Sequence, residues 1–159
     1  MIRQKAISIP TVATATVFVL AASVAWQASA GRELFKFPET YAEGVHYATV
    51  KRGNIREELF TSREAVAAVK NGEPIPSGTV ITMEDYRDGK LFRYVVIEKR
   101  TGWGTEHPPE VRNGEWEFQA FNADKSVNQN ESVSRCFSCH KSREQQDFVF
   151  TLDQMKSVN

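Results

Sequence analysis

The chain has 159 residues, in which 20 lysines and arginines balance 20 aspartates and glutamates. This balance, without a run of basic residues, argues against a nucleic-acid-binding protein and against a polybasic membrane-surface patch. The length fits one ordinary domain.

The N-terminus has the three-part layout of a secretory signal peptide. Arg3 and Lys5 precede a largely apolar run centred on TVATATVFVLAASVAW, and Ala28-Ser29-Ala30 then supplies a small-x-small cleavage site. A membrane anchor kept in the mature protein is the alternative, because the run is long enough to cross a bilayer. We expect residues 1–30 to be cleaved and residues 31–159, about 129 residues, to form one exported domain.

The first predicted elements are two strands joined by a turn. Residues 45–50 (VHYATV) alternate between the two faces of a strand and are rich in β-forming residues. Arg52-Gly53-Asn54 is a turn signal, and residues 55–60 (IREELF) are interpreted as the returning strand.

A short helix is predicted next. Thr61 stands three residues before Glu64, which is the spacing of a capping box. The alanine-rich stretch SREAVAAVK ends at Lys70, and Asn71-Gly72 then provides a left-handed stop.

The second half of the chain contains the clearest β-hairpin. The stretches TVITMEDY and LFRYVVIEKR flank Asp88-Gly89, a dipeptide typical of two-residue hairpin turns. In EWEFQAF, Trp116, Phe118 and Ala120 share one face, which is the pattern of a half-buried strand.

The C-terminal region is predicted to hold a helix and a last strand. Ser134 is a candidate cap for a short helix that carries both cysteines, and residues 147–152 (DFVFTL) are interpreted as a strand. Taken together, the elements indicate an antiparallel, mainly β (α+β) domain with short helices.

The two cysteines belong to a C-x-x-C-H motif made by Cys136, Cys139 and His140, which is the attachment signature of c-type haem. Helix positions three apart share one face, so both thiols can bond to one edge of a porphyrin while the histidine coordinates the iron. A structural zinc site needs four ligands, and only His46 and His107 could complete the set. A thioredoxin-like dithiol would need a βαβ setting, which this sequence lacks. Haem c is therefore favoured.

An electron-carrying cytochrome would need a second strong axial ligand, usually Met or His. Met83, Met155, His46 and His107 are the candidates, and each is interpreted as a core or surface residue. The sequence therefore favours an open sixth position on the iron, where a small molecule could bind.

Several stretches together resemble the cytochrome P-460 family: SRCFSCHKS, NGEWEFQAFNADKSVN and DFVFTLDQM near the C-terminus, with VHYATV and IPSGTVITMEDYRDGKLFRYVVIEKRTGWG upstream. The resemblance implies an antiparallel β-sandwich or barrel-like single domain with short helices, usually a homodimer. It implies haem c held by Cys136 and Cys139, with His140 as the proximal ligand. It also implies hydroxylamine oxidation in the periplasm, with electrons passed to a soluble acceptor such as another cytochrome c.

The resemblance also gives Lys70 a role. The family is known for a further covalent bond between a lysine and a porphyrin meso carbon, and Lys70 matches that position. On its own, Lys70 is a cation favourably placed at a helix C-terminus. With the resemblance, we expect a cross-link to Lys70, which requires a deprotonated amine and is assisted by apolar surroundings.

Glu131, five residues before the motif, resembles the family's distal carboxylate and is a candidate proton acceptor; a solvated loop residue is the equal alternative. The expected function is a periplasmic haem c enzyme that oxidises hydroxylamine to nitrous oxide, nitric oxide or nitrite. One alternative is a nitric-oxide-binding protein like the β-rich cytochromes c′, a sister group that shares the fold and lacks the lysine link. The other is an electron-transfer cytochrome c.

Overall fold

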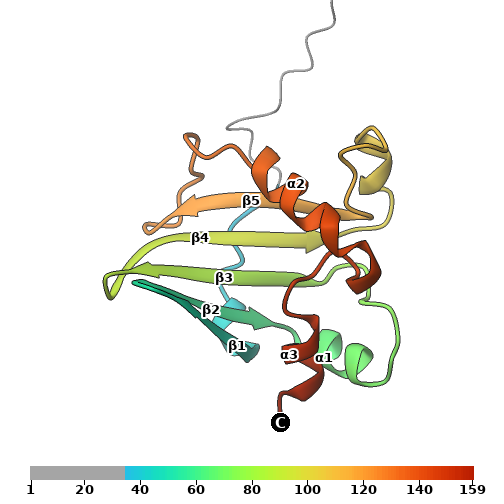
Figure 1. The fold of residues 1–159 in the computed structure, drawn as a ribbon, viewed down its shortest axis with the longest axis horizontal. Coiled ribbons are helices and arrows are strands. Elements are labelled where there is room, and N and C mark those ends of the chain that lie inside the picture. The colour runs from blue at the N-terminus through green and yellow to red at the C-terminus, as the bar shows by residue number, and fades with distance from the viewer. Residues whose placement is uncertain (1–34) are drawn as a thin grey trace, which may run out of the picture.

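A single antiparallel sheet organises the computed structural model, which describes residues 35–159. The predicted signal peptide lies outside the described residues. The strands follow chain order across the sheet (Figure 1): β1 (Val45–Arg52), β2 (Ile55–Thr61), β3 (Val80–Arg87), β4 (Lys90–Lys99) and β5 (Trp116–Asn122). The helices are α1 (Arg63–Lys70), α2 (Ser134–His140) and α3 (Leu152–Ser157), with 3-10 turns η1 (Tyr41–Glu43), η2 (Trp103–Glu106) and η3 (Lys141–Gln146).

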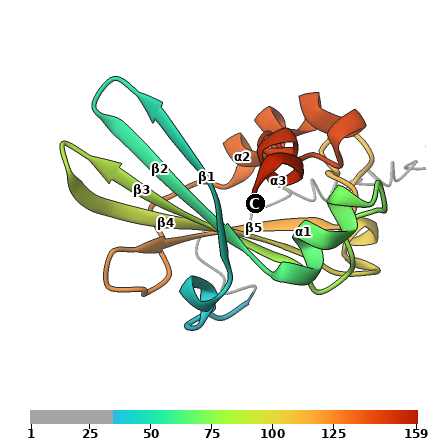
Figure 2. The same ribbon diagram turned by 90° about the horizontal axis from the view of Figure 1, so that it is seen from below.

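The helices α1, α2 and α3 cover one face of this sheet, whereas the segment that contains η1 crosses the other face (Figure 2). The larger apolar core lies between the sheet and the helices, and a smaller aromatic core lies on the opposite face. The predicted antiparallel, mainly β single domain with short helices is confirmed. The sheet is open, however, and a layer of helices takes the place of the second sheet that a sandwich would have. Within residues 35–159, no helix is both long and apolar enough to pass through a membrane.

Both predicted hairpins are confirmed, and the turn residues explain their register. Gly53 has a φ of 60° in the β1–β2 turn, while Asp88 and Gly89 have φ of 50° and 77° in the β3–β4 turn. Two successive residues with positive φ are typical of type I′ turns, whose twist matches that of the flanking strands. The Asp-Gly dipeptide therefore fixes the pairing of β3 with β4.

The strand β5 is buried more completely than its alternating pattern predicts. Trp116 and Phe118 belong to the core under the helices, as expected for one face. Phe121 belongs to the core on the opposite face, where its ring lies 5.2 Å from that of Phe37. The segment before η1 thus covers the face that the sequence pattern assigned to solvent.

The predicted capping residue of α1 is wrong by one position. Ser62 is the N-cap, and its Oγ accepts a hydrogen bond from the Ala65 amide at 3.1 Å. Thr61 instead ends β2, is 4% exposed, and donates its hydroxyl hydrogen to the Val80 carbonyl at 2.8 Å. Because the Thr61 hydroxyl is hydrogen-bonded within the sheet, it cannot cap the helix, and the cap is one residue later, at Ser62.

The predicted last strand at residues 147–152 is also wrong. Asp147 and Phe148 adopt left-handed φ values of 50° and 60°, and the chain then enters α3. Phe148 and Val149 are both buried although they are adjacent, and Phe150 is 39% exposed. Neighbouring residues of a strand point to opposite faces, whereas here two adjacent apolar side chains are both buried in the same core.

Replacing Ser62 by alanine should lower the free energy of unfolding by about 1 kcal/mol, because an N-cap oxygen satisfies an otherwise unpaired helix amide. Ser157→Ala is the matched control, since its exposed hydroxyl bonds only to carbonyls of its own helix, those of Asp153 and Gln154. Urea unfolding of both variants measures the difference. Equal stability of Ser62→Ala and the parent protein would contradict the assigned cap.

Candidate functional site

The helix α2 carries both cysteines of the C-x-x-C-H motif, as the sequence predicted. Cys136 is half-buried and packs against the apolar core, whereas Cys139 is exposed, and both are free thiols. Burial raises the pKa of the Cys136 thiol; the nearby Arg93 guanidinium opposes this and the Glu131 carboxylate adds to it. Ser134 is the first residue of this helix rather than its cap, which is Val133.

His140 ends α2, and one hydrogen bond fixes its tautomer. Its Nδ1 lies 2.6 Å from the carbonyl oxygen of Phe148. A carbonyl can only accept, so Nδ1 carries the hydrogen and Nε2 keeps its lone pair. Burial lowers the pKa of His140, and the bond to Phe148 partly opposes this effect. The imidazole is thus held as a neutral ligand that offers Nε2 to a metal.

Aromatic rings surround this imidazole. The ring of Phe118 on β5 lies 4.9 Å from it, and the ring of Phe150 lies 5.0 Å from it at an interplanar angle of 87°. Phe150 is one of two large apolar side chains that stand exposed among residues 35–159. Apolar surface next to a neutral imidazole and two thiols suits a large, flat, apolar cofactor.

The donor set fits haem c better than the alternatives. Two thiols three residues apart on one helix and an adjacent histidine with a free Nε2 supply two points of attachment and one axial ligand. In the described part of the chain, no group of three or more His, Cys, Asp or Glu side chains could hold a metal ion by itself.

The structure brings Glu131 close to the motif, together with two residues that the sequence did not reveal. Glu131 Oε2 lies 2.6 Å from Nη1 of Arg93, whose Nε lies 3.0 Å from Oδ2 of Asp85. Both Arg93 and Glu131 act electrostatically on Cys136. The sequence pattern predicted that Asp85 and Arg93 lie in strands. It did not predict which face of the sheet they share, or that this face lies next to α2.

Asp85 is unusual in this cluster because it is a buried carboxylate. It is 1% exposed, and Arg87 Nη2 also approaches its Oδ2, at 3.2 Å. Its Oδ1 and the Arg87 Nε have no hydrogen-bond partner. A buried polar atom without a partner is costly, so this cluster has unused hydrogen-bonding capacity beside the motif.

Lys70, the predicted cross-linking residue, lies elsewhere. It is exposed at the end of α1, which packs against α3. The helix α2 lies over the β4 and β5 side of the sheet, whereas α1 and α3 lie together toward the β1 and β2 side (Figure 1). Among residues 35–159, no hydrogen bond, ion pair or ring contact joins Lys70 to the motif.

The four candidates for a second axial ligand each have other contacts, although the His107 ring also lies 4.9 Å from that of Phe137 within the motif. His46 Nε2 pairs with Glu58 at 2.7 Å, and His107 pairs with Glu117. Met155 is fully buried in the core, and Met83 is partly buried against it. Their interpretation as surface or core residues agrees with these contacts.

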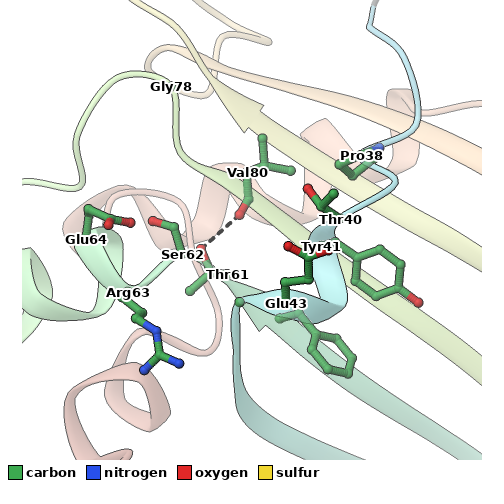
Figure 3. Close-up of a pocket in the computed structure, with 12 residues that line it drawn as sticks. Pro38, Thr40, Tyr41, Glu43, Thr61, Ser62, Arg63, Glu64, Gly78 and Val80 are labelled. Atoms are coloured by element: carbon green, nitrogen blue, oxygen red, sulfur yellow. Dashed lines mark hydrogen bonds between the residues drawn. The ribbon is translucent and has the colours of Figure 1, made fainter.

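One hollow in the described part of the chain lies apart from the motif. It has a volume of about 420 Å³ and lies between η1 and the start of α1 (Figure 3). Tyr41, Thr61 and Arg63 are among its lining residues, and it contains neither cysteine nor His140.

A comparison with protein-family models supports the haem assignment. The model described as Cytochrome P460 matches residues 37–151. A search of the curated proteins found no significant match. Because the matched region covers most of the chain and contains Cys136, Cys139 and His140, this chain belongs to the cytochrome P460 family of c-type haem proteins.

Proposed function

We propose that the chain binds haem c through thioether bonds from Cys136 and Cys139, with His140 Nε2 as the proximal iron ligand. The observation that carries this proposal is the 2.6 Å hydrogen bond between His140 Nδ1 and the Phe148 carbonyl. It holds the tautomer that an axial histidine needs. The same imidazole directly follows the helix face that carries both thiols.

We further propose that the protein oxidises hydroxylamine to a nitrogen oxide. Bound haem would supply an iron that takes electrons from the substrate and passes them to a soluble acceptor, such as another cytochrome c. The open distal position required for this is supported by the other contacts of the candidate ligands: His46 and His107 each pair with a glutamate, and Met155 is buried in the core. The family resemblance supports hydroxylamine as the substrate, a periplasmic location after signal-peptide cleavage, and a homodimer.

The chain's part in the chemistry is to position groups and to take up protons. Hydroxylamine oxidation releases protons, so a carboxylate near the substrate assists it. Glu131 is the proposed acceptor: it is partly exposed, which lets protons leave to solvent, and its bond to Arg93 Nη1 holds it near Cys136. Arg93 in turn is held by the buried Asp85, so the carboxylate is tied to the sheet.

One observation favours a second candidate, a nitric-oxide-binding protein of the β-rich cytochrome c′ type. Lys70 is exposed on α1, and α1 packs against α3 rather than α2. A covalent bond from Lys70 to the porphyrin needs the amine at the ring edge. The position of α1 therefore favours the candidate without a cross-link. Whether Lys70 is bonded to the haem distinguishes the two candidates.

Proteolysis of the native protein followed by mass spectrometry separates these candidates. Under the enzyme proposal, the haem-bearing peptide with Cys136 and Cys139 should also retain the peptide that contains Lys70. Lys70→Arg should release that peptide, whereas Lys141→Arg, which changes a lysine next to the motif, should not. If the Lys70 peptide is free in the parent protein and hydroxylamine is not consumed, the enzyme proposal is wrong.

Replacing Glu131 by glutamine should lower kcat for hydroxylamine oxidation by about 10²-fold, since the amide cannot accept a proton. Glu144→Gln, which alters an exposed glutamate on η3, is the control. Haem absorption should be the same in both variants, which separates proton transfer from haem binding.

A parental kcat in Glu131→Gln would rule out Glu131 as the proton acceptor. It would leave haem attachment by Cys136, Cys139 and His140 in place.

A further inference from the structure

The orientation of the His140 imidazole depends on one carbonyl group, that of Phe148. The residues that present this carbonyl, Asp147 and Phe148, both have left-handed φ values. A non-glycine residue in this region costs free energy, and Phe tolerates it less well than Asp. Something must therefore hold the turn in this conformation.

Backbone bonds and packing supply part of the support. The Phe148 amide donates to the Arg143 carbonyl at 2.8 Å, and the Asp147 amide donates to the Glu144 carbonyl at 3.2 Å. The Phe148 ring packs against Gly114 so closely that a Cβ there would lie 2.9 Å from Cε2 of the ring. These contacts stabilise the turn, but all of the backbone bonds come from η3 itself.

The Asp147 side chain ties the turn to the sheet. Its Oδ2 accepts from Lys99 Nζ at 2.6 Å, and its Oδ1 accepts from Trp116 Nε1 at 3.4 Å. Lys99 and Trp116 are direct partners in the β4–β5 register. The Lys99 side chain is only 14% exposed, so this charge-assisted bond is poorly screened by solvent.

We propose that Asp147, anchored by Lys99, is a positioning residue for the proximal ligand: it sets the Phe148 carbonyl against His140 Nδ1. The inference rests on the proposed haem. A firm hydrogen bond at Nδ1 makes Nε2 a stronger donor to iron, which favours the ferric state. The sheet would thus tune the haem through a chain of contacts from Lys99 to Asp147, to the Phe148 carbonyl, and to His140.

The test is Lys99→Met in the haem-loaded protein, with the reduction potential and the ferrous iron–histidine stretching frequency as readouts. Two effects on the potential have opposite signs. Loss of a positive charge by itself stabilises ferric haem and lowers the potential. Loss of positioning weakens the Nδ1 hydrogen bond, raises the potential and lowers the stretching frequency.

We expect a higher potential and a lower stretching frequency in Lys99→Met. Lys125→Met is the matched control, because Lys125 also pairs with a carboxylate, that of Glu39 at 2.5 Å, but on the exposed surface. The control should leave both readouts at parental values. A lower or unchanged potential in Lys99→Met, with an unchanged stretching frequency, would overturn the proposal.

Asp147→Asn provides a second test if Lys99→Met does not fold. Asparagine tolerates the left-handed conformation, so the chain can still form the turn, but the ion pair that anchors the turn to the sheet is lost. The stretching frequency should again fall, and a parental value would overturn the proposal.

Intact haem without hydroxylamine oxidation would overturn only the proposed activity, whereas a chain that carries no haem c would overturn both proposals.

Discussion

The hydrogen bond from His140 Nδ1 to the Phe148 carbonyl is the contact on which the site depends. It joins the end of α2 to the turn before α3, only eight residues further along the chain. The turn can present that carbonyl because the chain reverses through two left-handed residues, and the buried side chains of Phe148 and Val149 anchor it in the core. Met155 on α3 then fills the same core. The C-terminal segment that completes the apolar layer over the sheet therefore also fixes the tautomer of the candidate iron ligand.

The two ends of the motif helix α2 have different surroundings. At one end, a short-range turn and aromatic rings hold His140 in an apolar setting. At the other, Asp85 and Arg93 reach out from the sheet to place Glu131 near Cys136. A neutral ligand at one end and charged groups at the other suit a protein that binds an apolar cofactor and handles protons beside it. This division is the physical basis for preferring a reactive haem protein to a simple electron carrier.

Sequence reasoning predicted the elements that local chemistry determines. Alternation and the Asp88-Gly89 dipeptide predicted the strands and the central hairpin, and the motif spacing predicted that Cys136, Cys139 and His140 share one short helix. It failed where tertiary contacts decide the outcome. The apolar run in residues 147–152 forms a turn and the start of a helix, in which both Phe148 and Val149 are buried. The roles of Arg93 and Asp85 were not predicted, because a strand pattern does not show which face of the sheet will contact α2. The role of Lys70 was inferred from the family resemblance alone.

The measurement that tests the central claim most directly is the absorption spectrum of the purified native protein, followed during anaerobic addition of hydroxylamine with a soluble electron acceptor. The proposed function predicts a high-spin, five-coordinate ferric spectrum at rest. It also predicts acceptor reduction in proportion to the hydroxylamine added. A low-spin, six-coordinate spectrum that hydroxylamine leaves unchanged would contradict the open iron site and the enzymatic role together.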